Sequence, residues 1–372
     1  MPRLSTLANR LYRGEASIDF IGRRNTWYAV SALIVVVALA ALVFRGLNFG
    51  VEFEGGVEFR AQVAQPTESV DDMRAAVTGT GLEDNPTVVS SGDDTVRIQT
   101  ETLGTAEIDE VRTALESAGA TAVSSDFVGP SWGQQVANRA FIGLGVFLVL
   151  VVLFIGIYFR EWKMSISAIV ALAHDVLITV GVYAWSGFEV TPATVTGLLT
   201  ILGYSLYDTV VVFDKVRENT RGLAGSNRRT YAESANLAVN QTLVRSINTS
   251  VAALLPVAAI LWVGVAQLGS GPLKDLALAL FVGMAAGTYS SIFIATPLLA
   301  QLKDREPGVQ EQSRRVHSRR GDAPPPLVGA AAEPEVVTVP ARSASRPMGS
   351  GSAGRSQPQR QPRSQRGKGG RR

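Results

Sequence analysis

The sequence predicts an α-helical polytopic membrane protein with six transmembrane helices and an extracytoplasmic α+β ferredoxin-like domain. The chain is 46% hydrophobic and only 18% charged, whereas soluble domains carry about 25% charged residues. Its apolar residues gather in six runs, each near the roughly 20 residues that a helix needs to cross a bilayer. Most of the remaining polar residues form one block between the first two runs and one tail after the last.

The charges of the loops fit one membrane orientation. Basic residues precede the first apolar run and are frequent in the loops after the second and fourth apolar runs, whereas the other loops hold few basic residues. Basic loops stay on the cytoplasmic side, so we expect both termini in the cytoplasm. The predicted parts are a cytoplasmic N-terminus at 1–26, a first span at 27–46, and a five-helix membrane domain at 136–302 with spans at 140–159, 166–185, 193–213, 247–265 and 276–299.

Residues 47–135 form a polar block that is rich in acids and poor in bases, which suits the outer side of the membrane. Alternating or β-rich segments predict four strands, and apolar residues at helical spacing predict two helices. Their order, β-α-β-β-α-β, is that of a ferredoxin-like split unit. The strands are expected at 56–63, 87–91, 95–100 and 121–128, and the helices at 69–77 and 106–118. We expect the acidic residues to form a solvated surface.

Asp208 lies inside the fourth predicted span. A carboxylate there costs roughly 2.5 to 3.5 kcal/mol on insertion scales, so it normally faces protein or a water-filled path and is a candidate for ion or proton traffic. A structural role, with the carboxylate bonded to a neighbouring Ser or Thr, is about equally consistent with the spacing. The sequence alone leaves both open.

His174 and Asp175 lie near the middle of the third predicted span. Adjacent residues on a helix point about 100° apart, so one can face a polar path while the other bonds to a neighbouring helix. A buried His beside an Asp titrates near physiological pH, which suits a proton relay. The alternative is a polar clamp between helices.

Arg245 stands at the start of the fifth predicted span, near the same membrane face as Asp208. A long Arg side chain can reach inward along its helix, so the two residues could form a contact that depends on protonation of the Asp. The alternative for Arg245 is a positive-inside anchor. Gly283 and Gly287 form a GxxxG pair in the last span, which predicts a helix-packing face.

The composition argues against an enzyme. The chain has no Cys and two His, so a metal site is not expected. The sequence holds no P-loop, Ser-His-Asp set or metal motif, and we expect no catalytic residue and no cofactor.

Residues 303–372 are rich in Pro, Gly, Ser, Ala and Arg and lack apolar periodicity. They are expected to form a disordered basic cytoplasmic tail. Such a tail either contacts anionic lipid or ribosomal RNA or merely solvates the chain. We expect no specific nucleic-acid binding.

Three stretches resemble the SecF family of the Sec translocon, which belongs to the resistance-nodulation-division superfamily. They are GYSLYDTVVVFDKVREN at 203–219, GVEFEGGVEFR at 50–60 and AHDV at 173–176. The resemblance covers about Trp27 to Leu302. It implies a bacterial plasma (inner) membrane subunit that works with SecD beside the SecYEG channel and uses the proton motive force to help draw a translocating preprotein outward. Membrane lipid, SecA and YajC-like accessory proteins are further implied partners.

The resemblance also implies roles for single residues. The transmembrane Asp of the fourth helix and an Arg of the fifth serve proton-coupled movement in this family, and they match Asp208 and Arg245. The AHDV run favours a functional role for Asp175. Tyr207 departs from the family, in which Asn is frequent at this place, and this leaves the role of that neighbour open.

Two other functions remain possible at this stage. One is a small-molecule exporter half of the same superfamily, for which roughly 90 residues between the first two spans are few to build a substrate cleft. The other is a non-transporting scaffold of the translocon, in which Asp208 would be dispensable.

Overall fold

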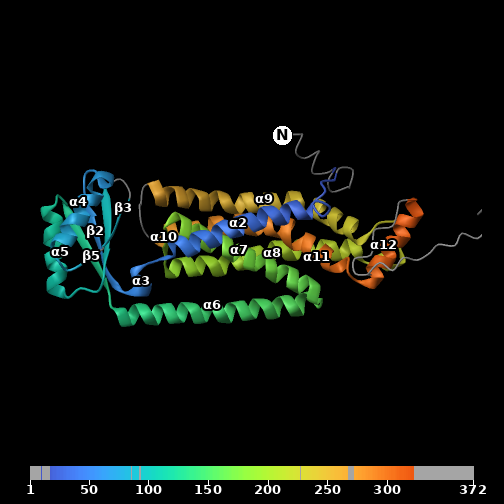
Figure 1. The fold of residues 1–372 in the computed structure, drawn as a ribbon, viewed down its shortest axis with the longest axis horizontal. Coiled ribbons are helices and arrows are strands. Elements are labelled where there is room, and N and C mark those ends of the chain that lie inside the picture. Colours follow the sequence, from blue (N-terminus) through green and yellow to red (C-terminus); the bar gives the residue numbers. More distant parts are fainter. Residues whose placement is uncertain are drawn as a thin grey trace, which may run out of the picture. The chain divides into compact units, whose positions relative to one another are not determined.

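The structure, a computed structural model, describes residue 10 and residues 17–84, 86–91, 94–226, 228–266 and 272–321. Within these residues, six helical segments are long and apolar enough to cross a membrane, as the fold class predicts. They are α2 (Arg24–Arg45), α6 (Pro130–Phe159), α7 (Trp162–Ser186), α8 (Pro192–Thr220), α9 (Tyr231–Ala266) and a last segment built from α10 (Pro272–Ser290), the π-helical turn η2 (Ser291–Ala295) and α11 (Thr296–Lys303). Figure 1 shows their arrangement.

Local sequence signals set the helix ends. α8 begins at Pro192, whose missing N–H is harmless at a first helical position, and the Thr191 hydroxyl accepts a hydrogen bond from the Thr194 N–H. α7 ends where Gly187 adopts a left-handed conformation. α9 begins at Tyr231, well before the predicted span at Ile247, because its first turns carry polar residues that hydropathy cannot detect.

The polar block folds into the predicted ferredoxin-like domain. Its four strands form one antiparallel sheet in the order β3-β4-β2-β5, and both helices pack on that sheet. The elements are β2 (Gly56–Gln62), α4 (Pro66–Gly79), β3 (Thr87–Ser91), β4 (Thr95–Thr100), α5 (Thr105–Ser117) and β5 (Ala122–Val128). Phe59 of β2 and Met73 of α4 are buried in its core with Leu115 of α5.

Three short elements that the sequence did not predict join this domain to the helices. β1 (Asn48–Phe49) pairs in parallel with β6 (Glu189–Val190), which lies between α7 and α8. The one-turn helix α3 (Val51–Glu54) then leads into Gly55 and Gly56, both at positive φ. A Cβ on Gly56 would lie 2.3 Å from the Thr100 carbonyl oxygen, so the strand can enter the sheet here only through glycine.

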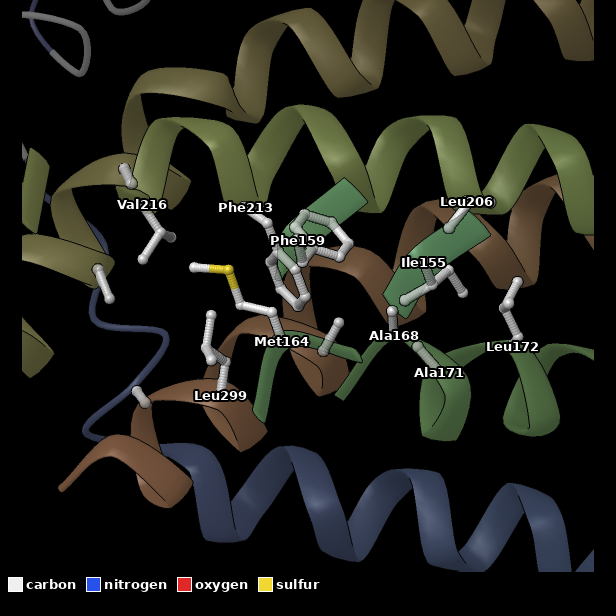
Figure 2. Close-up of a cluster of buried hydrophobic side chains, with 14 of the residues drawn as sticks. Ile155, Phe159, Met164, Ala168, Ala171, Leu172, Leu206, Phe213, Val216 and Leu299 are labelled. Carbon is white, nitrogen blue, oxygen red and sulfur yellow. The ribbon is translucent and has the colours of Figure 1, made fainter. Parts of the chain in front are cut away.

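The bundle core centres on α8, which packs against α7, α9 and α10. Figure 2 shows part of this core, in which the rings of Phe159 and Phe213 lie next to each other and Met164 lies beside them. The centroids of the two rings are 5.4 Å apart. α2 and α6 leave many large apolar side chains exposed. Those surfaces suit contact with lipid or with other membrane proteins.

The prediction of disorder from Lys303 onward is wrong for its first part. α12 (Pro307–Arg320) follows the bundle, and its Val316 is fully buried. Gln312 donates hydrogen bonds to the carbonyl oxygens of Ser226 (3.1 Å) and Arg229 (2.7 Å) in the α8–α9 loop. The few buried groups of α12 are too sparse to produce an apolar period. The rest of the predicted disordered tail, 322–372, lies outside the described residues.

Candidate functional site: two buried carboxylates between the helices

Asp175 of α7 is 1% exposed and is held by groups from three helices. Ser205 of α8 donates to its Oδ2 at 2.5 Å, and Ser290 of α10 donates to the same oxygen at 2.9 Å. The Nδ1 atom of His174 lies 3.2 Å from Oδ1. The predicted neighbourhood of His174 and Asp175 is therefore present, and serines from two other helices complete it.

Asp208 of α8 is 6% exposed and forms a second, similar site. Ser246 of α9 donates to its Oδ1 at 2.7 Å, and Ser291 of η2 donates to its Oδ2 at 2.5 Å. Ser205 and Asp208 are three residues apart on α8, so the two sites are displaced by about 4.5 Å along the helix axis.

Consecutive serines thus connect the two carboxylates. Ser290 binds Asp175 and Ser291 binds Asp208, at the point where α10 becomes a π-helical turn. Such turns alter the rotation of the residues that follow and are frequent at functional sites. Each hydroxyl also has a carbonyl oxygen of its own helix within reach, Gly287 at 3.2 Å for Ser290 and Thr288 at 3.1 Å for Ser291.

The predicted GxxxG pair produces the close helix approach that these bonds need. A Cβ on Gly283 would lie 2.0 Å from Ile201 of α8, and a Cβ on Gly287 would lie 2.8 Å from the Cβ of Ser205. Small residues let two helix backbones approach closely. Gly287 therefore allows α10 to reach the part of α8 that carries Ser205.

The expected contact between Asp208 and Arg245 is absent from the part of the chain that the structure describes. Arg245 instead donates to the Tyr207 hydroxyl at 3.0 Å in an exposed position. The reason is helical rotation, because neighbouring residues point about 100° apart. Ser246 faces Asp208 inside the bundle, while the residue before each of them points outward, so Arg245 meets Tyr207.

A second polar layer lies one turn from Asp208 along the same three helices. Tyr204 of α8 donates to Ser250 of α9 at 3.3 Å, and the Ser250 and Thr288 hydroxyls lie 2.6 Å apart. These residues were not recognised from the sequence, because Ser, Thr and Tyr do not interrupt a hydropathy run.

Apolar clusters close both ends of this polar region. Toward the β-sheet domain, Ile201, Leu198 and Met284 pack together. Toward α12 lies a second group, which we call the Phe20 cluster: Phe20, Val212, Val239, Leu243 and Ile292. Asp208 therefore lies in a polar layer between two apolar layers.

A different arrangement holds a carboxylate between the sheet domain and the bundle. Arg97 of β4 and Glu189 of β6 are both buried and form a two-pronged ion pair, with Nη1 of Arg97 2.7 Å from Oε2 of Glu189. Gln99 donates to Glu189 at 3.0 Å, and Glu58 lies 3.5 Å from Arg97. Burial raises the pKa of Glu189, and the Arg97 guanidinium opposes that rise. Arg97 and Glu189 are 92 positions apart, and no sequence pattern predicts their pairing.

No group of three or more His, Asp or Glu residues suited to a metal occurs in the described residues. The groups that hold Asp175 and Asp208 are mainly hydroxyls, which can both donate to a carboxylate and accept from a carboxyl group.

Fold and site together define a polytopic membrane protein of the transport class, with buried carboxylates between its spans and one sheet domain outside them. The comparisons with known proteins place it more narrowly. The model of the protein export membrane protein SecD/SecF C-terminal family matches residues 109–305, and that of the SecD/SecF GG motif matches residues 40–67. The second match includes Gly55 and Gly56.

Relatives at high identity agree. The chain is 50% identical to protein translocase subunit SecF of Streptomyces coelicolor over 323 residues, covering 86% of each chain. It is 48% identical to the subunit SecF of Mycobacterium tuberculosis H37Rv, covering 85% of this chain and 74% of that one. The crystal structure of SecDF from Thermus thermophilus superposes with a TM-score of 0.69 at 32% identity. This chain covers 39% of that SecDF chain, with 78% of its own residues matched.

The chain belongs to the SecD/SecF family of protein export membrane proteins. The resemblance that the sequence motifs indicated is confirmed.

Proposed function

We propose that this chain is a SecF-type subunit of the Sec preprotein translocase, which works with SecD and the proton motive force to assist protein export through SecYEG. It acts as an accessory subunit of a bacterial plasma membrane translocase rather than as an enzyme. Its termini are cytoplasmic, and its sheet domain lies on the outer side. SecA, YajC-like proteins, anionic lipid and the translocating preprotein are further contacts in this proposal.

The observation that carries the proposal is the pair of hydroxyl-held carboxylates. A carboxylate in the bilayer region is costly, and one without a cationic partner is well placed to take up a proton. Among the described residues Asp208 has two serine donors and no ion pair. Its protonation therefore changes the hydrogen bonds among α8, α9 and η2.

The exchange of one proton reverses the role of a serine. When Asp208 is ionised, Ser246 and Ser291 both donate to it, because a carboxylate only accepts. When Asp208 is protonated, it donates to one serine oxygen, and that serine turns its own proton to another acceptor. Ser291 has the Thr288 carbonyl oxygen at 3.1 Å for this purpose. Ser290 and Asp175 offer the same exchange one residue away.

The proposed partner is SecD. The chain spans about two fifths of the SecDF chain that it resembles in structure, and we assign the role of the remaining part of that SecDF chain to SecD. The exposed apolar faces of α2 and α6 are available for such a contact.

The test is export into proteoliposomes that hold this chain, SecD and the translocon, with and without a proton gradient. In the Asp208→Asn variant, which keeps size and polarity, the gradient-stimulated rate should fall to the rate without a gradient. Asp214→Asn is the matched control, because Asp214 lies on the same helix but is exposed and bonded to Tyr158. It should keep the stimulation.

The other outcomes separate the alternatives. Unchanged export with Asp208→Asn, while the complex with SecD still forms, would support the translocon scaffold and refute proton coupling at Asp208. Gradient-driven efflux of small molecules without any effect on preprotein export would instead support an exporter half.

A further inference from the structure

The segment before the first membrane helix is bound along α9. We call residues 17–22 the strap. Two side-chain amides hold it, those of Asn236 and Asn240, which are four residues apart and therefore on one face of α9. Figure 1 shows this part of the chain where it leads into α2, close to α9.

The hydrogen bonds resemble those between β-strands. The Ile18 N–H donates to Oδ1 of Asn240 at 2.8 Å, and Nδ2 of Asn240 donates back to the Ile18 carbonyl oxygen at 2.9 Å. The Phe20 N–H donates to Oδ1 of Asn236 at 2.9 Å, and Nδ2 of Asn236 donates to the Ile18 carbonyl oxygen at 3.0 Å. Asn240 is 1% exposed, so its amide depends on the strap for these partners.

The strap inserts Phe20 between the helices, on the side of Asp208 that lies toward α12. Phe20 is 3% exposed and packs with Val212, Val239, Leu243 and Ile292. Val212 is four residues, or about one turn, beyond Asp208 on α8. Ile292 follows Ser291, the serine that donates to Asp208. The Phe20 cluster therefore belongs to the apolar packing between Asp208 and the α12 end of the bundle.

Phe20 differs from the other members of this cluster in the kind of segment that carries it. Each of the others lies on a helix that continues through the bundle, whereas Phe20 lies on a non-helical segment. α9 carries both the two asparagines and Ser246, the second serine donor of Asp208. A shift of α9 that follows a change at Asp208 would therefore move the strap as well.

We propose that the strap is a removable plug, in which Phe20 closes the route between Asp208 and the α12 end of the bundle and Asn236 and Asn240 hold it there. Release of the strap opens that route to water and so to protons. Whether water reaches Asp208 by this route does not depend on proton coupling. The effect of strap release on export rests on the proposed function.

The absence of cysteine from the chain permits a direct test of access. A single reporter, Val212→Cys, lies in the fully buried part of the Phe20 cluster. Its reaction with N-ethylmaleimide is measured in the full-length chain with SecD, in membranes and without a gradient. We expect Phe20→Ala, and separately the pair Asn236→Ala with Asn240→Ala, to raise the labelling rate about tenfold, since labelling of a buried thiol follows the population of the open state.

Two controls keep the result specific. A reporter at Ile201→Cys, in the apolar layer on the other side of Asp208, should keep its labelling rate in the strap variants. Asn219→Ala removes an amide that bonds to Gln241 and not to the strap, and it should leave the Val212→Cys reporter slow. If the strap substitutions leave the labelling rate of Val212→Cys unchanged, the proposal is overturned. A rise in the labelling rate at both reporters also overturns it, because that result shows a general loosening of the bundle.

A second experiment locks the strap. The Asn236 amide lies 3.1 Å from the Ser17 hydroxyl, so a Ser17→Cys, Asn236→Cys pair can be oxidised to a cross-link. In the assembled translocon the oxidised protein should lose gradient-stimulated export and regain it on reduction. Full export in the locked state refutes a plug that must leave. If Asp208→Asn has already shown no proton coupling, the labelling rates still decide whether the strap closes the route.

Discussion

Asp175 and Asp208 lie between the membrane helices against serine hydroxyls, with one imidazole beside Asp175, whereas Glu189 and Glu58 lie between the sheet domain and the bundle against the guanidinium of Arg97. An arginine cannot release its proton in a protein, so it permanently favours the charged carboxylate. A hydroxyl both donates and accepts, so it tolerates either state of the carboxyl group. The first arrangement suits a group that changes its charge, and the second suits a fixed attachment.

The largest effect on stability is expected when the buried ion pair between the sheet domain and the bundle loses its arginine. Arg97→Ala leaves the buried Glu189 without a compensating charge, whereas Glu58 keeps its ion pair with Arg60. The change should lower the free energy of unfolding by about 3–5 kcal/mol. Denaturant unfolding in detergent measures this. Arg112→Ala is the control, because Arg112 of the same domain pairs with the exposed carboxylate of Asp109, and it should cost about 1 kcal/mol or less.

The loss in Arg97→Ala should also depend on pH. Burial already raises the pKa of Glu189, and removal of Arg97 raises it further. A raised carboxyl pKa favours the folded state below the ordinary glutamate value and costs stability as pH rises through the higher value. The destabilisation should thus be smaller at pH 5 than at pH 7.5. An equal loss at both pH values would show that Glu189 is not the cause.

A smaller effect should follow from separating the hydroxyls from Asp175. Gly287→Ala places a Cβ 2.8 Å from the Cβ of Ser205, so α8 and α10 must move apart and the hydrogen bond from Ser205 to Asp175 lengthens. Overpacking of this kind costs about 1–3 kcal/mol. Gly145→Ala on α6, where a Cβ meets nothing within 4 Å, should stay within about 0.5 kcal/mol. Similar unfolding midpoints for the two variants would contradict the close approach.

The smallest effect concerns Glu306, a partly exposed carboxylate that is held by the amines of the buried Lys163 and of Lys303. Glu306 lies 2.8 Å from Nζ of Lys163 and 3.2 Å from Nζ of Lys303. Burial alone would raise the pKa of Glu306, but bonds from both lysines hold it below the ordinary value. Its stabilisation is therefore present above the ordinary glutamate pKa and is lost as pH falls through the lowered one. Glu306→Gln should cost about 1 kcal/mol or less, because solvent screens this partly exposed group.

Salt and pH test whether the small stability cost of Glu306→Gln comes from the charge of Glu306. The difference between Glu306→Gln and the unchanged protein should shrink in high salt and disappear at acid pH, where both carry a neutral side chain at this position. A difference that persists at pH values well below the lowered pKa of Glu306 would point to shape rather than charge.

Prediction from the sequence was strongest where a pattern repeats along the chain. The β2 strand follows from alternating side chains, β4 follows from a short β-rich run, and the six helices follow from long apolar runs. The candidate carboxylates were also identifiable, because an Asp inside an apolar run is costly wherever it points. Their roles as proton sites remain a prediction that the Asp208→Asn experiment tests.

The partners of those carboxylates were not predictable in the same way. Helices that are apolar on every side carry no periodic signal for their rotation, so the sequence could not show whether Arg245 or Ser246 faces Asp208. The pattern suggested Arg245, and packing placed Ser246 there. Ser290 and Ser291 reach different carboxylates at the point where a π-helical turn begins, and composition does not mark that turn.

By itself, the sequence determined the spans, the sheet domain, the glycines at which backbones meet, and the family, because each of these depends on neighbours along the chain. The tertiary structure alone decided which hydroxyl binds which Asp, that Arg97 meets Glu189, and that Phe20 lies below Asp208. These contacts join residues far apart in sequence, and they depend on the rotation and relative height of whole helices, which only the packing of all segments together can fix.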